Sequence, residues 1–418
     1  MILGAIADDL TGATDLALML TRGGMRVLQV VGVPPAGTRF GDADAVVVSL
    51  KSRTVPAAEA QSMSVAAAEV LLANGADQIM FKYCSTFDST DAGNIGPVID
   101  ALLALLGESR TLACPAFPAN QRTVYKGHLF VGDALLSDSP MRDHPLTPMR
   151  DANLVRVLGR QTARPVALID HDTVRQGEEA VRHRLDALDG IAIVDAITDQ
   201  DLRTIGHAAS ALRLITGGSG IAMGLPEAYL RQGLLTPVQS GTRLSAPPGR
   251  GAVLAGSCSA ATRRQIEFAR AQGVPALKLE ADQIAEGRIT VEDAAAFAEQ
   301  QDSALAPLIY SSADPDIVRA AQERLGVGQA GELVEQFMGQ LAVALTRHGF
   351  TRLLVAGGET SGAVIRDLGV TSLQIGPEID PGVPWTLSTG HGPQLALALK
   401  SGNFGTDDFF LKAWSKLQ

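Results

Sequence analysis

The stretch GAIADDLTGATD, residues 4–15, holds the unit from which the rest of the fold can be built. An apolar run ends at Asp8 and Asp9, a turn with Gly12 follows, and apolar residues then recur at helical spacing. A strand that passes directly into a helix is the repeating unit of α/β proteins. The stretch therefore predicts a strand, a turn and a helix, with two carboxylates at the carboxyl end of the strand.

The same alternation continues along the chain and predicts a mostly parallel sheet with helices on both faces. In the first half, helix-like segments cover 56–73 and 95–106, and the candidate strands are 1–7, 26–33, 44–50, 78–83, 111–115, 165–170, 191–196 and 212–218. Further along, a helix begins near 259, and the candidate strands are 252–257, 275–280, 307–312, 352–358 and 372–376.

Two segments interrupt this pattern. LTPVQSGTRLSAPPGRG, residues 235–251, is rich in Gly, Pro, Ser and Thr and is interpreted as a linker. We therefore expect two domains, 1–240 and 250–418, each a mostly parallel sheet flanked by helices, with the active site in the cleft between them. Residues 115–165 are long, polar and interrupted by proline, which is typical of an excursion over an active site, a short irregular subdomain or a dimerisation arm.

Composition excludes several classes of protein. The chain has 418 residues and a formal net charge of -10, which argues against general nucleic-acid binding. The apolar N-terminal run is short, lacks a basic flank and predicts neither a signal peptide nor a membrane span. The three cysteines form no CxxC pair and the histidines show no metal-ligand spacing, so no metal ligand can be named. We expect a cytoplasmic protein, and a homo-oligomer is compatible with the sequence.

Charged and hydroxylic residues follow three predicted strands of the first domain. Ligands bind at the carboxyl ends of strands in open α/β sheets, so the candidates are Asp8, Asp9, Lys51, Arg53, Lys82, Ser85 and Thr86. Guanidinium and ammonium groups suit a small acid, and hydroxyls with Asp suit a polyol. The alternative is that Asp9 or Thr11 caps the helix and that the charges are solvated loop residues.

Three glycine-rich turns of the second domain each lead into a helix-like segment. They lie at 256–259, 357–362 and 401–405. Free N–H groups at a helix N-terminus favour phosphate, and glycine lets a ligand approach the backbone closely. Three such turns in one domain predict a nucleotide site. No GxxxxGK[ST] is present, and GVGQAG at 326–331 follows a helical pattern, so we interpret it as a turn between helices.

Segments spread over nearly the whole chain resemble the four-carbon acid sugar kinase family. They are IADDLTGATD (6–15), SLKSRT (49–54), FKYCSTFDST (81–90), CPAFPANQRTVYKGHLFV (114–131), VAGGETSGAV (355–364), IGPEIDPGVPW (375–385) and LALKSGNFGTDDFF (397–410). The closing segments are most similar to the branch that phosphorylates the terminal hydroxyl of 3-oxo-tetronate in sugar-acid catabolism. Relatives act on threonate or erythronate.

The resemblance implies that the N-terminal domain binds the acid sugar and that the C-terminal domain binds ATP with Mg²⁺. The ATP contacts that it implies are Ser257, Ser259, Gly357, Gly358, Glu359, Thr360, Ser361, Gly362 and Gly402. Asp8 and Asp9 are the catalytic candidates, with Asp9 favoured as the base because we expect it to be the more exposed. A non-catalytic acid-sugar sensor is the alternative from another class. A dehydrogenase or lyase would need a nicotinamide site or a metal cluster, which the sequence does not show.

Overall fold

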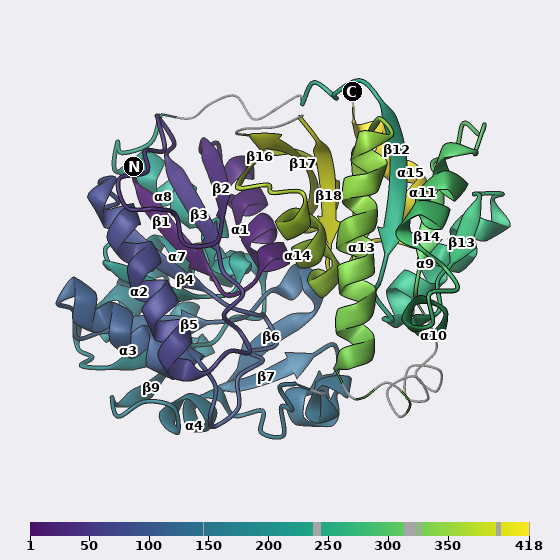
Figure 1. The fold of residues 1–418 in the computed structure, drawn as a ribbon. Helices are drawn as coiled ribbons and strands as arrows, with labels where there is room; N and C mark the ends of the chain where they lie inside the picture. The colour runs from purple at the N-terminus through teal and green to yellow at the C-terminus, as the bar shows by residue number, and fades with distance from the viewer. Residues whose placement is uncertain are drawn as a thin grey trace. The chain divides into compact units, whose positions relative to one another are not determined.

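The computed structural model of the chain describes residues 1–144, 146–236, 244–312, 324, 326, 328–389 and 394–417. Contacts within the chain divide it into two compact units, Met1–Ser240 and Gly241–Gln418. The first is coloured from purple to teal in Figure 1 and the second from teal-green to yellow. Residues 237–243 of the expected linker lie outside the described residues.

The first unit is built on a parallel sheet. Its order is β2-β3-β1-β4-β11-β5-β10-β9, and every pairing recorded between these strands is parallel. The bounds are β1 Leu3–Ala7, β2 Val27–Val31, β3 Ala45–Ser49, β4 Gln78–Lys82, β5 Thr111–Cys114, β9 Val166–Ile169, β10 Ile191–Val194 and β11 Leu214–Gly217. Strands β1, β3, β4, β5, β10 and β11 are buried along their whole length, as the continuous apolar runs of the sequence predict.

Helices flank this sheet (Figure 1). Helices α2 and α3 pack against each other, and α1 packs against strands β2 and β3 and the short helix η4. The helical bounds are α1 Leu10–Arg22, α2 Ala57–Ala73, α3 Ile95–Leu106, α4 Leu154–Gly159, α5 His171–Val174, α6 Glu178–Asp186, α7 Asp199–Ala209, η4 Ser219–Met223 and α8 Leu225–Arg231.

The segment 115–165 is a small subdomain of regular structure. Strands β6 (Arg122–Tyr125), β7 (His128–Val131) and β8 (Ala134–Leu135) form an antiparallel sheet, with the 3₁₀ turns η1 Pro118–Asn120, η2 Leu136–Asp138 and η3 Pro140–Asp143 beside it. The fully buried Asp195 anchors it, because its carboxylate accepts hydrogen bonds from the N–H groups of Lys126 at 2.7 Å, Gly127 at 2.9 Å and His171 at 3.0 Å. Of the alternatives raised from the sequence, the structure shows a short subdomain, but one with regular strands, and a buried carboxylate more than 60 residues from Lys126 and Gly127 ties it down.

The second unit has a mixed sheet of order β13-β14-β12-β15-β18-β17-β16. Strands β13 to β18 in this order pair in parallel, and β17 pairs antiparallel with β18 and β16. The bounds are β12 Arg250–Ala255, β13 Ala276–Lys278, β14 Leu308–Tyr310, β15 Phe350–Ala356, β16 Ser372–Asp380, β17 Val383–Thr389 and β18 Ala396–Lys400. Strands β17 and β18 were not among the strands expected from the sequence, and Pro384 in β17 weakens the local strand pattern.

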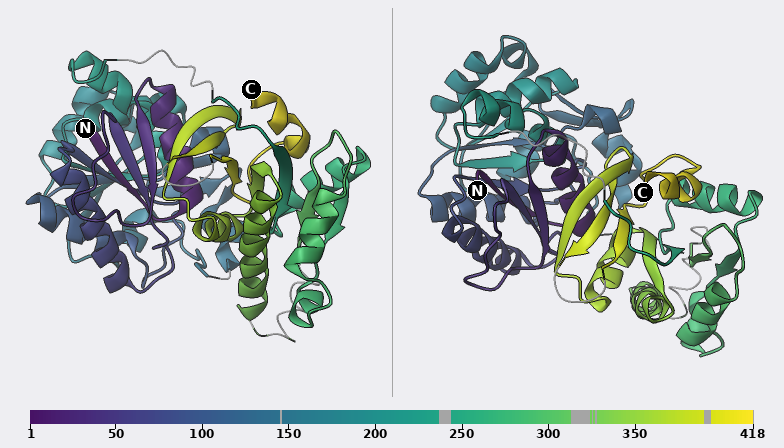
Figure 2. Two further views of the ribbon diagram at one scale, coloured as in Figure 1. Left: turned by 45° about the horizontal axis from the view of Figure 1, so that its top comes forward. Right: turned by 90° about the horizontal axis from the view of Figure 1, so that it is seen from above.

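Helices cover both faces of this second sheet. Figure 2 shows α13 and α14 on the opposite side of the central strands from α15. The bounds are α9 Ala260–Ala271, α10 Ala281–Ala285, α11 Val291–Glu299, α13 Gln329–Arg347, α14 Gly358–Asp367, α15 Phe409–Lys412 and η5 Ala413–Lys416. Helix α13 starts at Gln329, inside the GVGQAG stretch 326–331, of which residue 327 lies outside the described part of the chain.

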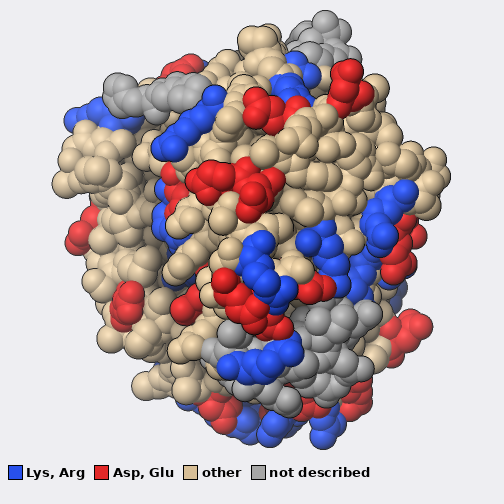
Figure 3. All heavy atoms as spheres, turned by 45° about the vertical axis from the view of Figure 1, so that its right-hand side comes forward, with Lys and Arg blue, Asp and Glu red and all other residues tan. Residues whose placement is uncertain are grey.

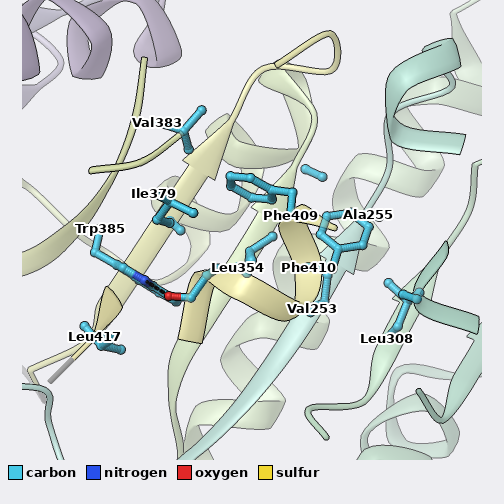
Figure 4. Close-up of a cluster of buried hydrophobic side chains, with 14 of the residues drawn as sticks. Val253, Ala255, Leu308, Leu354, Ile379, Val383, Trp385, Phe409, Phe410 and Leu417 are labelled. Atoms are coloured by element: carbon cyan, nitrogen blue, oxygen red, sulfur yellow. Dashed lines mark hydrogen bonds between the residues drawn. The ribbon is translucent and has the colours of Figure 1, made fainter. Parts of the chain in front are cut away.

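The core under α15 is aromatic. Figure 4 shows Phe409, Phe410 and Trp385 packed around Val253 and Leu354 of the central strands. Trp385 is fully buried, and its indole N–H donates to the carbonyl of Ala413 at 2.8 Å. Burial of such rings stabilises the unit by several kcal/mol, on the order of 3–5 kcal/mol for each ring if truncated to Ala. This packing fixes the C-terminal segment against the sheet and so fixes the turn that precedes it.

Candidate functional site

Asp8, Asp9, Arg53, Lys82 and Asp88 form a charged cluster in the first unit, called here the acid–base cluster. Arg53 holds Asp8 with both prongs of its guanidinium, Nε to Oδ2 at 2.9 Å and Nη2 to Oδ1 at 2.8 Å. The same Nη2 donates to Asp9 Oδ1 at 2.8 Å. Two adjacent carboxylates thus meet at one nitrogen atom, because the strand ends at Ala7 and the chain turns between them.

Strand register brings these residues to one edge of the sheet. Ala7 pairs with Ser49 of β3 on one side and with Lys82 of β4 on the other. The N–H of Asp8 donates to the Lys82 carbonyl at 3.1 Å, and the N–H of Ser52 donates to the Asp8 carbonyl at 3.0 Å. Backbone bonds therefore tie the three strand ends together, and the prediction that they converge is confirmed for Asp8, Arg53 and Lys82.

Asp9 also caps helix α1. Its side chain accepts from the N–H of Gly12 at 3.2 Å and from the Thr11 hydroxyl at 2.9 Å. The capping alternative raised from the sequence is thus what the geometry shows, but the same carboxylate also contacts Arg53. Its side chain is 27% exposed against 8% for Asp8, so Asp9 is the more accessible of the pair.

The Lys82 ammonium lies over the first turn of α1. Its Nζ is 3.6 Å from Asp9 Oδ1. A Cβ atom at Gly12 would lie 1.8 Å from Nζ and 2.3 Å from Asp9 Oδ1, so glycine at this position lets the two charged groups lie where they do. Sequence reasoning noted Gly12 only as part of a turn, since the close approach involves a strand 70 residues away.

A strained loop after β4 carries the third carboxylate. Phe87 and Asp88 have φ of 66° and 40°, a left-handed conformation that residues other than glycine rarely adopt. The Thr86 hydroxyl donates to Asp88 Oδ1 at 2.7 Å, and Asp88 Oδ2 lies 3.8 Å from Arg53 Nη1. Such strain persists only where surrounding structure imposes it and often marks functional sites. Here it turns Asp88 toward Arg53.

The surroundings shift the pKa values of Asp8 and Asp9 in opposite directions. Burial by itself raises a carboxyl pKa, but Arg53 and Lys82 hold the pKa of Asp9 well below its usual range. For Asp8, burial dominates and raises the pKa, and the ion pair with Arg53 offsets only part of this. Asp9 therefore stays ionised at neutral pH.

A further carboxylate, Asp15, lies one turn along α1 and was not singled out from the sequence. It is buried and accepts from the Ser219 hydroxyl at the start of η4. Burial raises the pKa of Asp15 to about 6, and Lys82 and Ser219 offset part of that rise. Its Oδ1 atom is buried without a hydrogen-bond partner among the residues that the structure describes.

The remaining predicted substrate residues lie on the same loops. Lys51 follows β3 by two residues and is exposed, and Ser85 is half-buried in the strained loop. Thr86 is buried, and its hydroxyl lies 3.0 Å from Cys84 Sγ as well as bonding to Asp88. Thr86 thus supports Asp88, while Lys51 and Ser85 stay predictions.

A cavity of about 470 Å³ opens in the second unit at the carboxyl ends of β12, β13, β14 and β15. Five predicted nucleotide residues line it: Ser257, Gly357, Gly358, Glu359 and Thr360. The other four, Ser259, Ser361, Gly362 and Gly402, lie beside these turns but not on the cavity surface. Ser259 caps α9 by accepting from the Thr262 N–H at 3.2 Å, and Ser361 is fully buried inside α14.

The N-terminus of α14 faces this cavity without a side-chain cap. Gly357 precedes it with φ of 129°, and a Cβ atom there would lie 2.9 Å from Thr360 Oγ1 and 3.1 Å from the Ser257 nitrogen. A Cβ atom on Gly358 would meet no other atom within 4 Å. The uncapped N–H groups of a helix start favour an anion, and a cavity of this size suits a nucleotide.

The far wall of the cavity comes from residues that sequence reasoning missed. Lys278 ends β13, Glu280 and Asp282 follow it, and Val334 and Glu335 belong to α13. Asp282 pairs with Arg324. They form no sequence motif, because they come from separate elements that are brought together only by the fold.

Figure 3 shows Asp and Glu interspersed with Lys and Arg on the face that it presents. Among the described residues, no cluster of three or more His, Cys, Asp or Glu side chains could hold a metal ion. No helix in the same part of the chain is long and apolar enough to cross a membrane.

Two family models match most of the chain. A model described as a sugar-binding N-terminal domain matches residues 3–225, and one described as a nucleotide-binding C-terminal domain matches residues 252–410. The first match contains the acid–base cluster, and the second contains the cavity.

Full-length relatives and solved structures agree with these matches. The chain is 54% identical to a protein of Cupriavidus necator named 3-oxo-tetronate kinase, over 100% of this chain and 97% of that protein. It is 55% identical to one of the same name from Burkholderia multivorans, over 99% and 96%. A crystal structure of a Salmonella typhimurium protein titled putative tRNA synthase superposes with a TM-score of 0.87 at 42% identity, covering 100% of this chain and 99% of the other. With these matches over its whole length, the chain belongs to the four-carbon acid sugar kinase family.

Proposed function

We propose that the chain transfers a phosphoryl group from ATP to the terminal hydroxyl of 3-oxo-tetronate. The observation that carries this proposal is the full-length similarity to proteins named 3-oxo-tetronate kinase at 50% identity and above. Family membership makes the chain a sugar-acid kinase and a phosphotransferase, as predicted from its motifs. The substrate, the acceptor hydroxyl and the residues that act on them form the proposal.

The acid sugar binds at the acid–base cluster of the first unit. Arg53 and Lys82 are cations at a strand edge, where ligands of α/β sheets bind. Arg53 donates from Nε and Nη2 to Asp8 and Asp9. Its Nη1 atom faces Asp88 and is the nitrogen that donates to the incoming acid. The paired carboxylates orient the guanidinium, and a charge-assisted hydrogen bond from it to the substrate contributes about 1.5–3 kcal/mol.

ATP binds in the cavity of the second unit, its phosphates toward the start of α14. The fit rests on the open space above Gly358 and on the uncapped helix start behind it. Mg²⁺ carried by the phosphates would supply charge neutralisation, as is usual for this ion. Glu359 is the carboxylate of that turn that can hold a water of the ion.

Asp9 orients the acceptor hydroxyl. Because its pKa is held low, Asp9 is ionised and accepts a hydrogen bond from the hydroxyl before transfer. The oxygen then bonds to the γ-phosphorus as the bond to the bridging oxygen of ADP breaks, and the hydroxyl proton passes to Asp9. Positioning contributes most of the rate in such transfers.

The test is a substrate panel with ATP and Mg²⁺. ADP release is measured with 3-oxo-tetronate, threonate and erythronate of each stereochemistry, and the product is located by phosphorus NMR. ADP release that requires 3-oxo-tetronate, with phosphate on the terminal carbon, supports the proposal. Faster turnover of threonate or erythronate would reassign the substrate within the family, and binding without turnover would favour a sensor.

A further inference from the structure

Lys400, the last residue of β18, is fully buried although it ends in an ammonium group. Its Nζ donates to the carbonyls of Ser401 at 3.0 Å, Gly402 at 3.0 Å and Phe404 at 3.1 Å. A fourth contact joins it to Thr262 Oγ1 at 3.0 Å. A single side chain thus donates to three carbonyls of the turn that follows its strand.

Helix α9 holds the same turn from the other side. The Gly402 carbonyl also accepts from Ser259 Oγ at 2.6 Å and from Thr262 Oγ1 at 2.9 Å. Gln265, on the next turn of the same helix face, donates to the carbonyls of Phe404, Gly405 and Thr406 at 3.0–3.1 Å. The carbonyls of this turn therefore point inward, toward Lys400 and α9.

This arrangement directs N–H groups the opposite way. In a trans peptide the N–H points away from the carbonyl that precedes it. The inward carbonyls of Ser401, Gly402 and Phe404 thus turn the N–H groups of Gly402, Asn403 and Gly405 outward. None of these three N–H groups donates to another residue that the structure describes. Several free N–H groups on one side of a turn form an anion-binding surface.

The charge of Lys400 also lacks compensation. Its acceptors among the described residues are uncharged oxygens, and its other close neighbour is the Phe409 ring, 6.0 Å from Nζ to the centroid. Burial lowers the pKa of Lys400 to about 7. A buried cation without a carboxylate is costly unless an anion approaches it.

Lys400 lies where the three glycine-rich turns meet. Its carbonyl accepts from the Gly357 N–H at 2.8 Å, which links it to the turn before α14. A Cβ atom on Gly402 would lie 2.3 Å from Ser257 Oγ, so the third turn touches the first. Gly402, in the third turn, is therefore next to Ser257, which lines the cavity.

We propose that Lys400 is a positioning residue of the nucleotide site, which sets the turn Ser401–Gly405 so that its N–H groups bind the phosphates. This inference rests on the proposed function, in which ATP occupies the cavity of the second unit. In this role the buried lysine orients the backbone N–H groups of the turn, and these groups bind the phosphates. The lysine itself does not touch the nucleotide.

The test compares ligands that differ only in phosphate number. Calorimetry with Mg²⁺ gives the affinities of adenosine, AMP, ADP and a non-hydrolysable ATP analogue for the wild type and for Lys400→Met. We expect adenosine affinity to stay within about twofold, and the gain from added phosphates to fall at least about tenfold, the effect of one charge-assisted hydrogen bond. An equal loss for adenosine and ADP, or no loss, would overturn the inference.

Two further variants separate positioning from stability. Thr386→Val removes a buried hydroxyl of β17 that donates to the Leu397 carbonyl at 2.7 Å, and it should lower stability without changing the phosphate-dependent gain. Thr262→Val removes one donor to Gly402 and one partner of Lys400, so it should reduce the gain in the same direction. It replaces Lys400→Met as the deciding variant if that protein does not fold, and an unchanged gain would then refute the inference.

Inorganic tripolyphosphate distinguishes this inference from the proposed function. If the wild type binds tripolyphosphate in a way that depends on Lys400 but neither binds nor consumes ATP, the nucleotide assignment fails and the role of Lys400 stands. If the wild type uses ATP and Lys400→Met retains the full phosphate-dependent gain, the role of Lys400 fails and the kinase proposal stands.

Discussion

Asp9 has two roles that a single substitution can separate. It caps α1 through Gly12 and Thr11, and it carries a charge that faces Arg53 and Lys82. Asparagine is as good an N-cap as aspartate, so Asp9→Asn keeps the cap and removes the charge.

We expect Asp9→Asn to lower kcat at least about 100-fold, the usual minimum for a general base. The unfolding free energy should change by less than about 1 kcal/mol, because the cap is kept. Steady-state kinetics and urea unfolding check the two halves. If KM for the acid carries the loss instead, Asp9 orients the substrate, and near-normal turnover would remove it from the mechanism.

Gly12 provides space for a cation. Gly12→Ala places a Cβ atom 1.8 Å from the Lys82 ammonium and 2.3 Å from Asp9 Oδ1. Because both groups must shift, we expect KM for the acid to rise at least about tenfold, the effect of one lost charge-assisted contact. Alanine favours a helix by about 1 kcal/mol over glycine, so stability should not fall by the amount that a packing defect would cause. Gly159→Ala at the end of α4, with no atom within 4 Å of the new Cβ, is the matched control. Unchanged acid affinity in Gly12→Ala would contradict the role given to Lys82.

Asp15 makes stability depend on pH. The pKa of Asp15 is about 6 in the folded chain and 3.8 for an ordinary Asp, which represents the unfolded chain. Between pH 3.8 and 6 the folded state therefore keeps a proton that the unfolded state releases. The wild type should therefore lose stability as pH rises from about 4 to 6, by up to about 3 kcal/mol relative to Asp15→Asn, and the difference should be constant above. Urea unfolding from pH 4 to 7.5 measures it. Ser219→Ala should extend the window upward because the Ser219 hydroxyl lowers this pKa, and a difference independent of pH would refute the assignment.

At the scale of elements, the nucleotide cavity consists of turns between strands and helices. One thiol, Cys258, lies on such a turn and lines the cavity. Burial raises the pKa of Cys84 and of Cys114 to about 12, which suppresses their thiolates at neutral pH.

We expect maleimide to modify one thiol, Cys258, much faster than the other two. ADP with Mg²⁺ should slow that reaction in proportion to its occupancy of the cavity, and a four-carbon acid alone should not. Mass spectrometry of labelled peptides follows the reaction, and Cys258→Ser should lack the fast phase. Full reactivity at a concentration of ADP that saturates binding by calorimetry would place the nucleotide elsewhere.

The repeating strand–helix units could be predicted because each is encoded locally. The runs that predicted β1, β3 and β4 are mostly apolar, and the strands begin and end within two residues of the predicted bounds. Strands β17 and β18 could not be predicted so, since β17 has Pro384 as its second residue and pairs antiparallel with both of its neighbours, which a strand–helix repeat does not provide. The order of the segment 122–135 depends on Asp195, which no local pattern reveals.

At the scale of the whole molecule, the two ligands are assigned to different units. Arg53→Lys keeps the half-buried positive charge but loses the bidentate contact with Asp8. We expect KM for the acid to rise by roughly one to two decades, while the affinity for ADP measured without acid stays within about twofold. Kinetics and calorimetry on one preparation give both values. A comparable loss of ADP affinity would show that Arg53 supports the molecule as a whole.

The candidate site was predictable where ligand residues follow strands directly. Asp8 directly follows β1, Lys82 is the last residue of β4, and Arg53, Ser257 and Gly358 come within four residues of a strand end. Asp88 could not be given its role from the sequence, because its direction depends on two residues in a left-handed conformation. Lys400 could not either, because a lysine in an apolar strand gives no sign that its four acceptors lie in the turn ahead and on another helix.

The loop after β4 has a consequence for how this enzyme tolerates change. The Phe87 ring is buried edge-on against Tyr83, with centroids 5.6 Å apart, and this packing holds the backbone in its unfavourable conformation. Glycine at 87 would relax the backbone by about 1 kcal/mol but would forfeit the ring, at about 3–5 kcal/mol. The packing of Phe87 and the direction of Asp88 are thus coupled, and a substitution that repacks a neighbour of Phe87 should redirect the Asp88 carboxylate in a chain that still folds.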